Sequence, residues 1–166
     1  QGKPTQEYPL TGGAYFDVVS FHDYPAYSMS VWDNSIGGFR QLRYSDKAAD
    51  AMVDLKNQFD DIQKQYGYDG TKYPKKPSIL TEINIPRKTF NTYFGSEEAQ
   101  RNFIIKALVE AQQYDIKQLY VYQIGEAANY DNATDAYQLM GLYENLSQDQ
   151  PGQEKLTSEG TAFKTT

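Results

Sequence analysis

Polar side chains that could do chemistry follow three apolar stretches of the chain. His22 and Tyr24 follow the first stretch, Glu82 follows the second, and Gln123 lies at the end of the third. Residues two apart in an extended strand point the same way, so His22 and Tyr24 are expected to share one face. A carboxylate at the end of an apolar strand is costly unless a partner or a ligand uses it. Glu82 is therefore the first candidate for a catalytic group.

The elements that must position these residues can be predicted from hydrophobic periodicity. Three stretches are rich in β-branched and aromatic residues, and we predict strands over residues 14–21, 78–83 and 118–124. Apolar residues at steps of three and four predict a helix over about 46–66. A second helix is expected between the second and third strands, with Ser96 as its N-cap and an end near Tyr114.

The alternation of strands and helices predicts an α/β fold with a parallel sheet covered by helices. In such folds functional groups gather where the strands end, because the carboxyl ends of parallel strands meet at one edge. We therefore expect His22, Tyr24, Glu82 and Gln123 to converge, with Leu80 and Glu82 on one face of their strand. The segment 30–38 reads as a polar, Gly-rich loop, and the C-terminal tail reads as the beginning of a helix.

Composition limits the classes of function that the chain can have. Its 166 residues fit one domain, and the net charge of −6 argues against nucleic-acid or anionic membrane partners. Without cysteine there is no thiolate chemistry, and the single histidine makes a His-rich metal site impossible. No apolar run approaches the ~18 residues of a membrane span, and no cofactor is expected.

Each candidate residue also has a purely structural interpretation. A lone Glu82 can be a surface charge at a strand end, and His22 can be a half-buried histidine whose ring is satisfied by the protein. Gln123 can tie down its own loop, and Trp32 can be ordinary core. The common placement of polar groups at three strand ends, rather than any single residue, is what favours a site.

The segments "DVVSFHDYP", "KPSILTEIN" and "QLYVYQIGE" resemble the last three strands of clan A glycoside hydrolase barrels. The resemblance matches His22 and Tyr24 to the His-x-Tyr that commonly ends the sixth strand, and Glu82 to the nucleophile that ends the seventh. The eighth strand supplies residues that hold the sugar, here Gln123 and Glu126. It implies a section of a (β/α)8 TIM barrel, about three parallel βα units (strands six to eight), with residues 1–166 as the C-terminal portion of the barrel domain.

The same resemblance implies a retaining glycoside hydrolase that acts on an oligo- or polysaccharide. Such an enzyme uses two carboxyls ~5–5.5 Å apart, one as nucleophile and one as acid/base. Glu82 would be the nucleophile, Tyr24 would hold it ionised and oriented, and His22 and Trp32 would contact the sugar. The acid/base of the family usually follows an Asn, and no Asn-Glu precedes His22.

We therefore expect the isolated chain to be inactive, and the N-terminal half of the barrel to be its partner. Two other functions stay open at this point. One is a non-catalytic carbohydrate-binding or scaffold module derived from such a barrel. The other is a different barrel enzyme with Glu82 as a general base, which would need a cofactor or metal. A secreted or cell-surface location is favoured over a cytoplasmic one.

Overall fold

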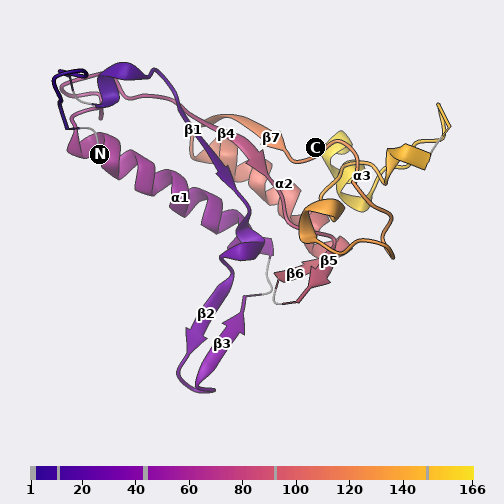
Figure 1. Cartoon of the computed structure of the whole chain (residues 1–166). Helices are drawn as coiled ribbons and strands as arrows, with labels where there is room; N and C mark the ends of the chain where they lie inside the picture. Colours follow the sequence, from indigo (N-terminus) through magenta and orange to yellow (C-terminus); the bar gives the residue numbers. More distant parts are fainter. Residues whose placement is uncertain (1–2, 11, 43–44, 92, 149) are drawn as a thin grey trace.

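The computed structural model describes residues 3–10, 12–42, 45–91, 93–148 and 150–166. Its centre is a three-stranded parallel sheet in the order β1–β4–β7 (Figure 1). The strands are β1 (Val19–Asp23), β4 (Ser78–Ile83) and β7 (Ile116–Val121). The predicted parallel pairing of three adjacent strands is therefore confirmed.

The bounds of β4 match the prediction, whereas β1 and β7 differ from it at both ends. Residues Gly12–Tyr15 form a short 3-10 helix, η1, instead of the start of β1. Gly13 lies so close to the ring of Tyr68 that a Cβ atom would sit 2.2 Å from it. After Val121 the chain leaves the sheet and pairs with a later segment: the amide of Gln123 donates to the carbonyl of Met140 at 2.6 Å.

The two long helices are close to the predicted ones. Helix α1 (Ser45–Gln65) buries one face, and α2 (Glu97–Gln113) packs against α1 and β7. Ser96 is the N-cap of α2, and its side chain accepts a hydrogen bond from the amide of Ala99 at 3.1 Å. The expected terminal helix is α3 (Ser158–Thr165), which packs against α2. No helix in the described ranges is long and apolar enough to span a membrane.

Two antiparallel hairpins were not predicted. The first joins β2 (Ser30–Asp33) to β3 (Gly38–Gln41), and the second joins β5 (Lys88–Phe90) to β6 (Tyr93–Ser96). The prediction of a loop over 30–38 was wrong, because the polar residues are only the turn of a hairpin whose strands pair Trp32 with Phe39. Figure 1 shows this first hairpin projecting away from the sheet and helices.

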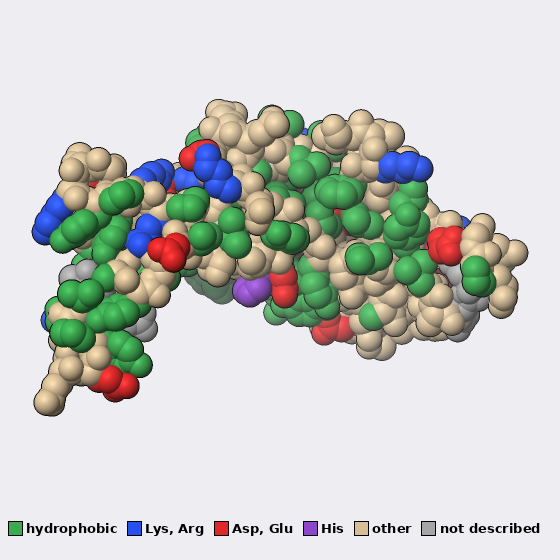
Figure 2. Space-filling model, turned by 90° about the horizontal axis from the view of Figure 1, so that it is seen from above, with side chains coloured by type: hydrophobic (Ala, Val, Ile, Leu, Met, Phe, Trp, Pro, Cys, Tyr) green, Lys and Arg blue, Asp and Glu red, His purple; other side chains and the backbone are tan. Residues whose placement is uncertain are grey.

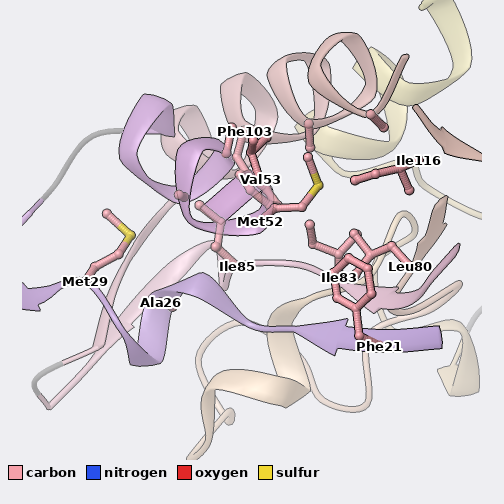
Figure 3. Packing of buried hydrophobic residues seen from close by; sticks show 14 of the residues in the cluster. Phe21, Ala26, Met29, Met52, Val53, Leu80, Ile83, Ile85, Phe103 and Ile116 are labelled. Carbon is pink, nitrogen blue, oxygen red and sulfur yellow. The ribbon is translucent and has the colours of Figure 1, made fainter. Parts of the chain in front are cut away.

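The core lies between the sheet and the two long helices. Phe21, Leu80 and Ile83 from the strands belong to one buried cluster with Met52 of α1 and Phe103 of α2 (Figure 3). Leu80 and Ile83 are both fully buried although they are three residues apart. The strict alternation of β4 is thus broken, and its pairing register shifts between these two residues.

The expectation that Leu80 and Glu82 share one face was therefore wrong. An irregularity of this kind inserts an extra residue and re-aims the side chains beyond it. Here it keeps Leu80 in the core and leaves the side chain of Glu82 42% exposed.

Candidate functional site

Three of the predicted residues meet where β1 and β4 end. The pairing register places His22 opposite Glu82. The hydroxyl of Tyr24 donates a short hydrogen bond to Oε2 of Glu82. Nδ1 of His22 lies 3.7 Å from the same oxygen. The expected contact between Tyr24 and Glu82 is thus present, and one carboxylate oxygen is the point on which the three side chains converge.

The carboxylate of Glu82 is only partly engaged by the protein. Among the described residues no hydrogen bond reaches its second oxygen, Oε1. The side chain of His22 is 58% exposed, and Figure 2 shows the single histidine, in purple, at the surface beside an acidic side chain. Burial and the hydrogen bond to Glu82 raise the pKa of Tyr24, so its phenol remains a protonated donor. The arrangement therefore fixes one oxygen and leaves the other open to a ligand.

Thr81 connects His22 to the backbone of the neighbouring strand. Its hydroxyl donates to the carbonyl of Phe21 at 2.9 Å and lies 3.2 Å from Nδ1 of His22. These contacts hold the imidazole above the sheet next to Glu82. Sequence reasoning missed Thr81, although its position directly before Glu82 could have drawn attention to it.

A cluster of tyrosine rings surrounds Tyr24. The rings of Tyr122 and Tyr137 lie edge-on to it, at centroid distances of 5.6 and 4.9 Å. Tyr27, from the 3-10 helix η2 (Pro25–Tyr27), stacks on Tyr137 at 5.4 Å and contacts Tyr93 of β6 at 4.2 Å. The fifteen tyrosines of the sequence showed no pattern that would identify these partners, because they come from four separate segments.

Gln123 joins this cluster indirectly. Its side-chain amide donates to the carbonyl of Tyr137 at 3.1 Å, and Tyr137 belongs to the 3-10 helix η3 (Ala136–Leu139). Gln123 thus ties its own loop to η3, which is the structural role considered for it from sequence. Among the described residues no hydrogen bond joins its side chain to Glu82, and its predicted role in sugar binding stays a prediction.

Glu126 does not converge with the others. Its side chain is fully buried, and its two oxygens accept from Nε and Nη2 of Arg87 at 2.5 and 2.6 Å. Burial raises the pKa of Glu126, while the hydrogen bonds from Arg87 act in the opposite direction. The sugar contact that the sequence suggested for Glu126 would require a carboxylate at the surface, and the structure places this one inside.

Trp32 also lies apart from the converging residues. It belongs to the projecting hairpin, where it is 57% exposed and its indole N–H donates to Oδ1 of Asn34 at 2.9 Å. No ring contact joins Trp32 to the tyrosine cluster within the described residues. Its role as a sugar contact is therefore a separate question from that of Glu82.

A buried polar network begins two residues beyond Glu82 and was missed from sequence. The side-chain amide of Asn84 donates to the carbonyls of Tyr122 and Met140 at 2.6 and 2.8 Å. It also lies 3.0 Å from Oε2 of Glu159, which is completely buried. Burial raises the pKa of Glu159 well above its usual range, while the hydrogen bond from Asn84 acts in the opposite direction.

One further carboxyl, Asp23, stands between His22 and Tyr24 in the chain. Neighbouring residues of a strand point to opposite faces, so Asp23 points away from Glu82. One of its oxygens is buried without a hydrogen-bond partner among the described residues. Burial raises the pKa of Asp23 to about 7.

The described residues contain no group of three or more His, Cys, Asp or Glu side chains that could hold a metal ion. A hollow of about 460 Å³ near the start of α1 is lined by Asp50, Asp54 and Glu110, among others, and does not include Glu82. The converging residues stand instead on an open edge of the sheet. Chemistry at this edge would rest on a carboxylate, a phenol and an imidazole.

Neither protein-family models nor curated protein sequences match the chain. Solved structures do. An endo-laminarinase from Formosa Hel1_33_131 matches with a TM-score of 0.58 and 13% identity over 79% of this chain. A Rhizomucor miehei β-1,3-glucanosyltransferase of glycoside hydrolase family 17 matches with a TM-score of 0.52 and 17% identity over 88% of this chain. An active-site mutant of a β-1,3-glucanosyltransferase from the same organism, in complex with laminaritriose, matches with a TM-score of 0.54 and 17% identity over 84% of this chain.

These matches concern the fold. The chain spans 36–44% of the length of the three proteins it resembles. Those proteins are glycoside hydrolases with TIM-barrel folds, so the parallel sheet and its helices correspond to part of such a barrel.

Proposed function

We propose that this chain carries the nucleophile part of a retaining glycoside hydrolase site that acts on β-1,3-glucans. The observation that carries the proposal is the engagement of Glu82: one oxygen is held by Tyr24, the other is open, and His22 stands beside it. The site lies at the carboxyl edge of a parallel sheet, where barrel enzymes place their chemistry. Similarity in fold to an endo-laminarinase and to a β-1,3-glucanosyltransferase that binds laminaritriose supports the choice of glucan.

In this proposal Oε1 of Glu82 attacks the anomeric carbon of the sugar. A bond forms between that oxygen and the carbon while the bond to the leaving oxygen breaks. The electron pair goes to the leaving oxygen, which takes a proton from a carboxylic acid. Water then hydrolyses the glycosyl–Glu82 ester and returns the carboxylate. Tyr24 keeps Oε2 in place throughout, and His22 contacts a sugar hydroxyl.

The carboxylic acid of this reaction is not among the converging residues. Asp23 points to the other face. The side chain of Glu126 is buried, and both of its oxygens are bonded to Arg87. We therefore assign the acid/base to the part of a barrel that this chain does not contain. The N-terminal half of a barrel is accordingly the proposed partner, and without it the chain should turn over very slowly.

A second candidate is a non-catalytic carbohydrate-binding module, favoured by the presence of only one open carboxylate at the site. The two functions differ in what Glu82 does. In an enzyme its loss removes turnover, whereas in a binding module its loss affects only affinity.

The test uses an aryl β-glucoside whose activated phenol leaves without protonation. An ordinary glycoside, whose leaving group needs a proton from the acid, is the second substrate. On that substrate we expect the chain joined to an upstream barrel half to be about 10²–10⁴-fold faster than the isolated chain. Glu82→Ala should abolish turnover in the joined protein, and azide should partly restore it by replacing the nucleophile. Glu98→Ala, which removes an exposed carboxylate at the start of α2, is the matched control. Turnover that survives Glu82→Ala would show that the chemistry lies elsewhere.

A further inference from the structure

The projecting β2–β3 hairpin carries an exposed pair of aromatic rings. Trp32 and Phe39 are direct partners in the pairing register, so both rings stand on the same face. Their centroids are 5.3 Å apart with an interplanar angle of 84°. Trp32 is 57% exposed and Phe39 is 70% exposed. An aromatic surface of this kind on a projecting element calls for a physical explanation.

The indole of Trp32 is fixed rather than free to rotate. Its N–H is bonded to Asn34, and the ring of Phe39 lies edge-on to it. The turn between them is ordered by Asp33, which accepts from the amide of Ser35 at 2.9 Å and pairs with Arg40 at 3.0 Å. A flat surface that is held in place before a ligand arrives loses little entropy when it binds.

Stabilisation of the hairpin explains only part of this arrangement. A two-stranded hairpin is marginal in water, and a cross-strand aromatic pair helps to hold it together. That role accounts for the edge-to-face contact. It does not account for two rings that remain 57% and 70% exposed on a hairpin that projects away from the sheet and helices (Figure 1).

The size of the aromatic surface limits what can cover it. Each strand has four residues and is therefore about 14 Å long at ~3.4 Å per residue. Two such strands, each occupying about 5 Å of width, offer one face on the order of 100–200 Å². A stable protein interface buries about 800 Å² on each partner, so this face alone is too small for a second copy or another protein.

Charge excludes two other occupants. The chain has a net charge of −6, and Asp33 adds a carboxylate at the turn. Nucleic acids and anionic lipid surfaces both require clustered positive charge, which this hairpin lacks. A neutral pyranose ring fits better, because its C–H face is apolar and its hydroxyls can bond to the side chain of Asn34, which lies beside Trp32.

We propose that the β2–β3 hairpin binds a neutral glucan chain, with a pyranose ring stacked on Trp32 and Phe39. The hairpin follows the carboxyl end of β1, and η2 connects it to Tyr24. A bound chain would thus start at the edge of the sheet on which Glu82 stands. The proposal rests on the proposed function for the choice of glucan, but it requires no turnover.

The experiment uses the 166-residue chain and the fluorescence of Trp32, its only tryptophan. Titration with laminaritriose and with laminarin should quench or blue-shift the emission in a saturable way. In affinity electrophoresis through laminarin, Trp32→Ala should weaken binding at least about tenfold, since it removes the larger stacking ring. Phe39→Ala should weaken binding less, and Phe163→Ala, at a partly exposed ring on α3 outside the hairpin, should leave it unchanged.

Trp32→Phe guards against a loss of binding caused by unfolding of the hairpin, because it keeps an aromatic ring at the same position. It should retain most of the affinity. Equal retardation of wild type and Trp32→Ala would overturn the proposal. So would an emission shift with neutral phosphatidylcholine vesicles in place of laminarin, which would identify a membrane-binding tip. Hydrolysis of the aryl glycoside is a separate readout, so failure of glucan binding by the β2–β3 hairpin and failure of the catalytic proposal are distinguishable.

Discussion

Two carboxylates near the same edge of the sheet have opposite surroundings. Glu82 has one oxygen bonded to Tyr24, one oxygen open and a side chain that is 42% exposed. Glu126 is completely buried, and both of its oxygens are bonded to Arg87, whose third nitrogen bonds to Glu97 at 3.0 Å. Glu82 is therefore available to a ligand, whereas both oxygens of Glu126 are already bonded to Arg87.

The difference shows how the loops beside the site are held. Arg87 comes from the segment after β4, Glu97 begins α2, and Glu126 lies in the loop after β7. The ring of Tyr130 covers the guanidinium at 4.8 Å. A buried ion pair with all its bonds made holds these segments in one geometry, whereas an unpaired charge there would be strongly destabilising.

The same substitution at the two carboxylates should therefore have very different effects, and the largest is expected at Glu126. Glu126→Gln leaves Arg87 buried with only the half-exposed Glu97 as a charged partner. We expect a loss of about 3–5 kcal/mol in the free energy of unfolding, measured by urea denaturation. Glu98→Gln on the surface of α2 is the control. If the loss is below about 1 kcal/mol, the pair does not hold the loops as we infer.

A smaller effect is expected from Asp23 as the pH changes. Its pKa is about 7 in the folded protein against 3.8 for the free side chain. The folded state thus binds the proton more tightly, so this stabilisation is complete below pH ~4 and is lost as the pH rises through ~7. With allowance for partial exposure, the loss should be on the order of 2 kcal/mol.

Asp23→Asn should remove this fall in stability between pH 4 and 7. Urea denaturation across that range compares it with Asp17→Asn, which changes an exposed aspartate just before β1. Parallel curves for wild type and Asp23→Asn would contradict the assignment of the proton to Asp23.

The smallest effect on stability is expected at Glu82 itself. In Glu82→Gln the amide oxygen can still accept from Tyr24, and no buried charge is left without a partner. The free energy of unfolding should change by at most about 1 kcal/mol in the same urea titration. A loss as large as that of Glu126→Gln would instead make Glu82 a structural residue and remove the basis of the catalytic proposal.

Much of this contrast could not be read from the sequence. The two long helices and β4 were predicted closely, because periodicity and capping are local signals. The contact of Tyr24 with Glu82 was predicted from the common edge at which their strands end, together with the roles that the resemblance to glycoside hydrolase barrels implies. Glu126 was predicted to bind sugar from the family resemblance. Its ion pair with Arg87 was missed because the two residues are 39 positions apart and no local sequence pattern indicates their contact.

The errors at Leu80 and at the first hairpin have a related origin. Alternation along β4 assumes a regular strand, and the register shift that keeps both Leu80 and Ile83 in the core depends on the neighbouring strands. The segment around Trp32 was taken as a loop because its turn is rich in polar and glycine residues. The pairing that makes it a hairpin involves Phe39, seven residues further on.

The contact between Thr81 and His22 decides the direction of hydrogen bonding at the sheet edge. A hydroxyl has one proton, and that of Thr81 is already given to the carbonyl of Phe21. In a neutral ring the proton must then reside on Nδ1 of His22, which donates to Thr81 and leaves Nε2 as a bare lone pair. A sugar hydroxyl that meets Nε2 can only donate to it. Its own oxygen becomes more electron-rich, and groups that can only accept, such as a carbonyl or an ether, gain nothing at that nitrogen.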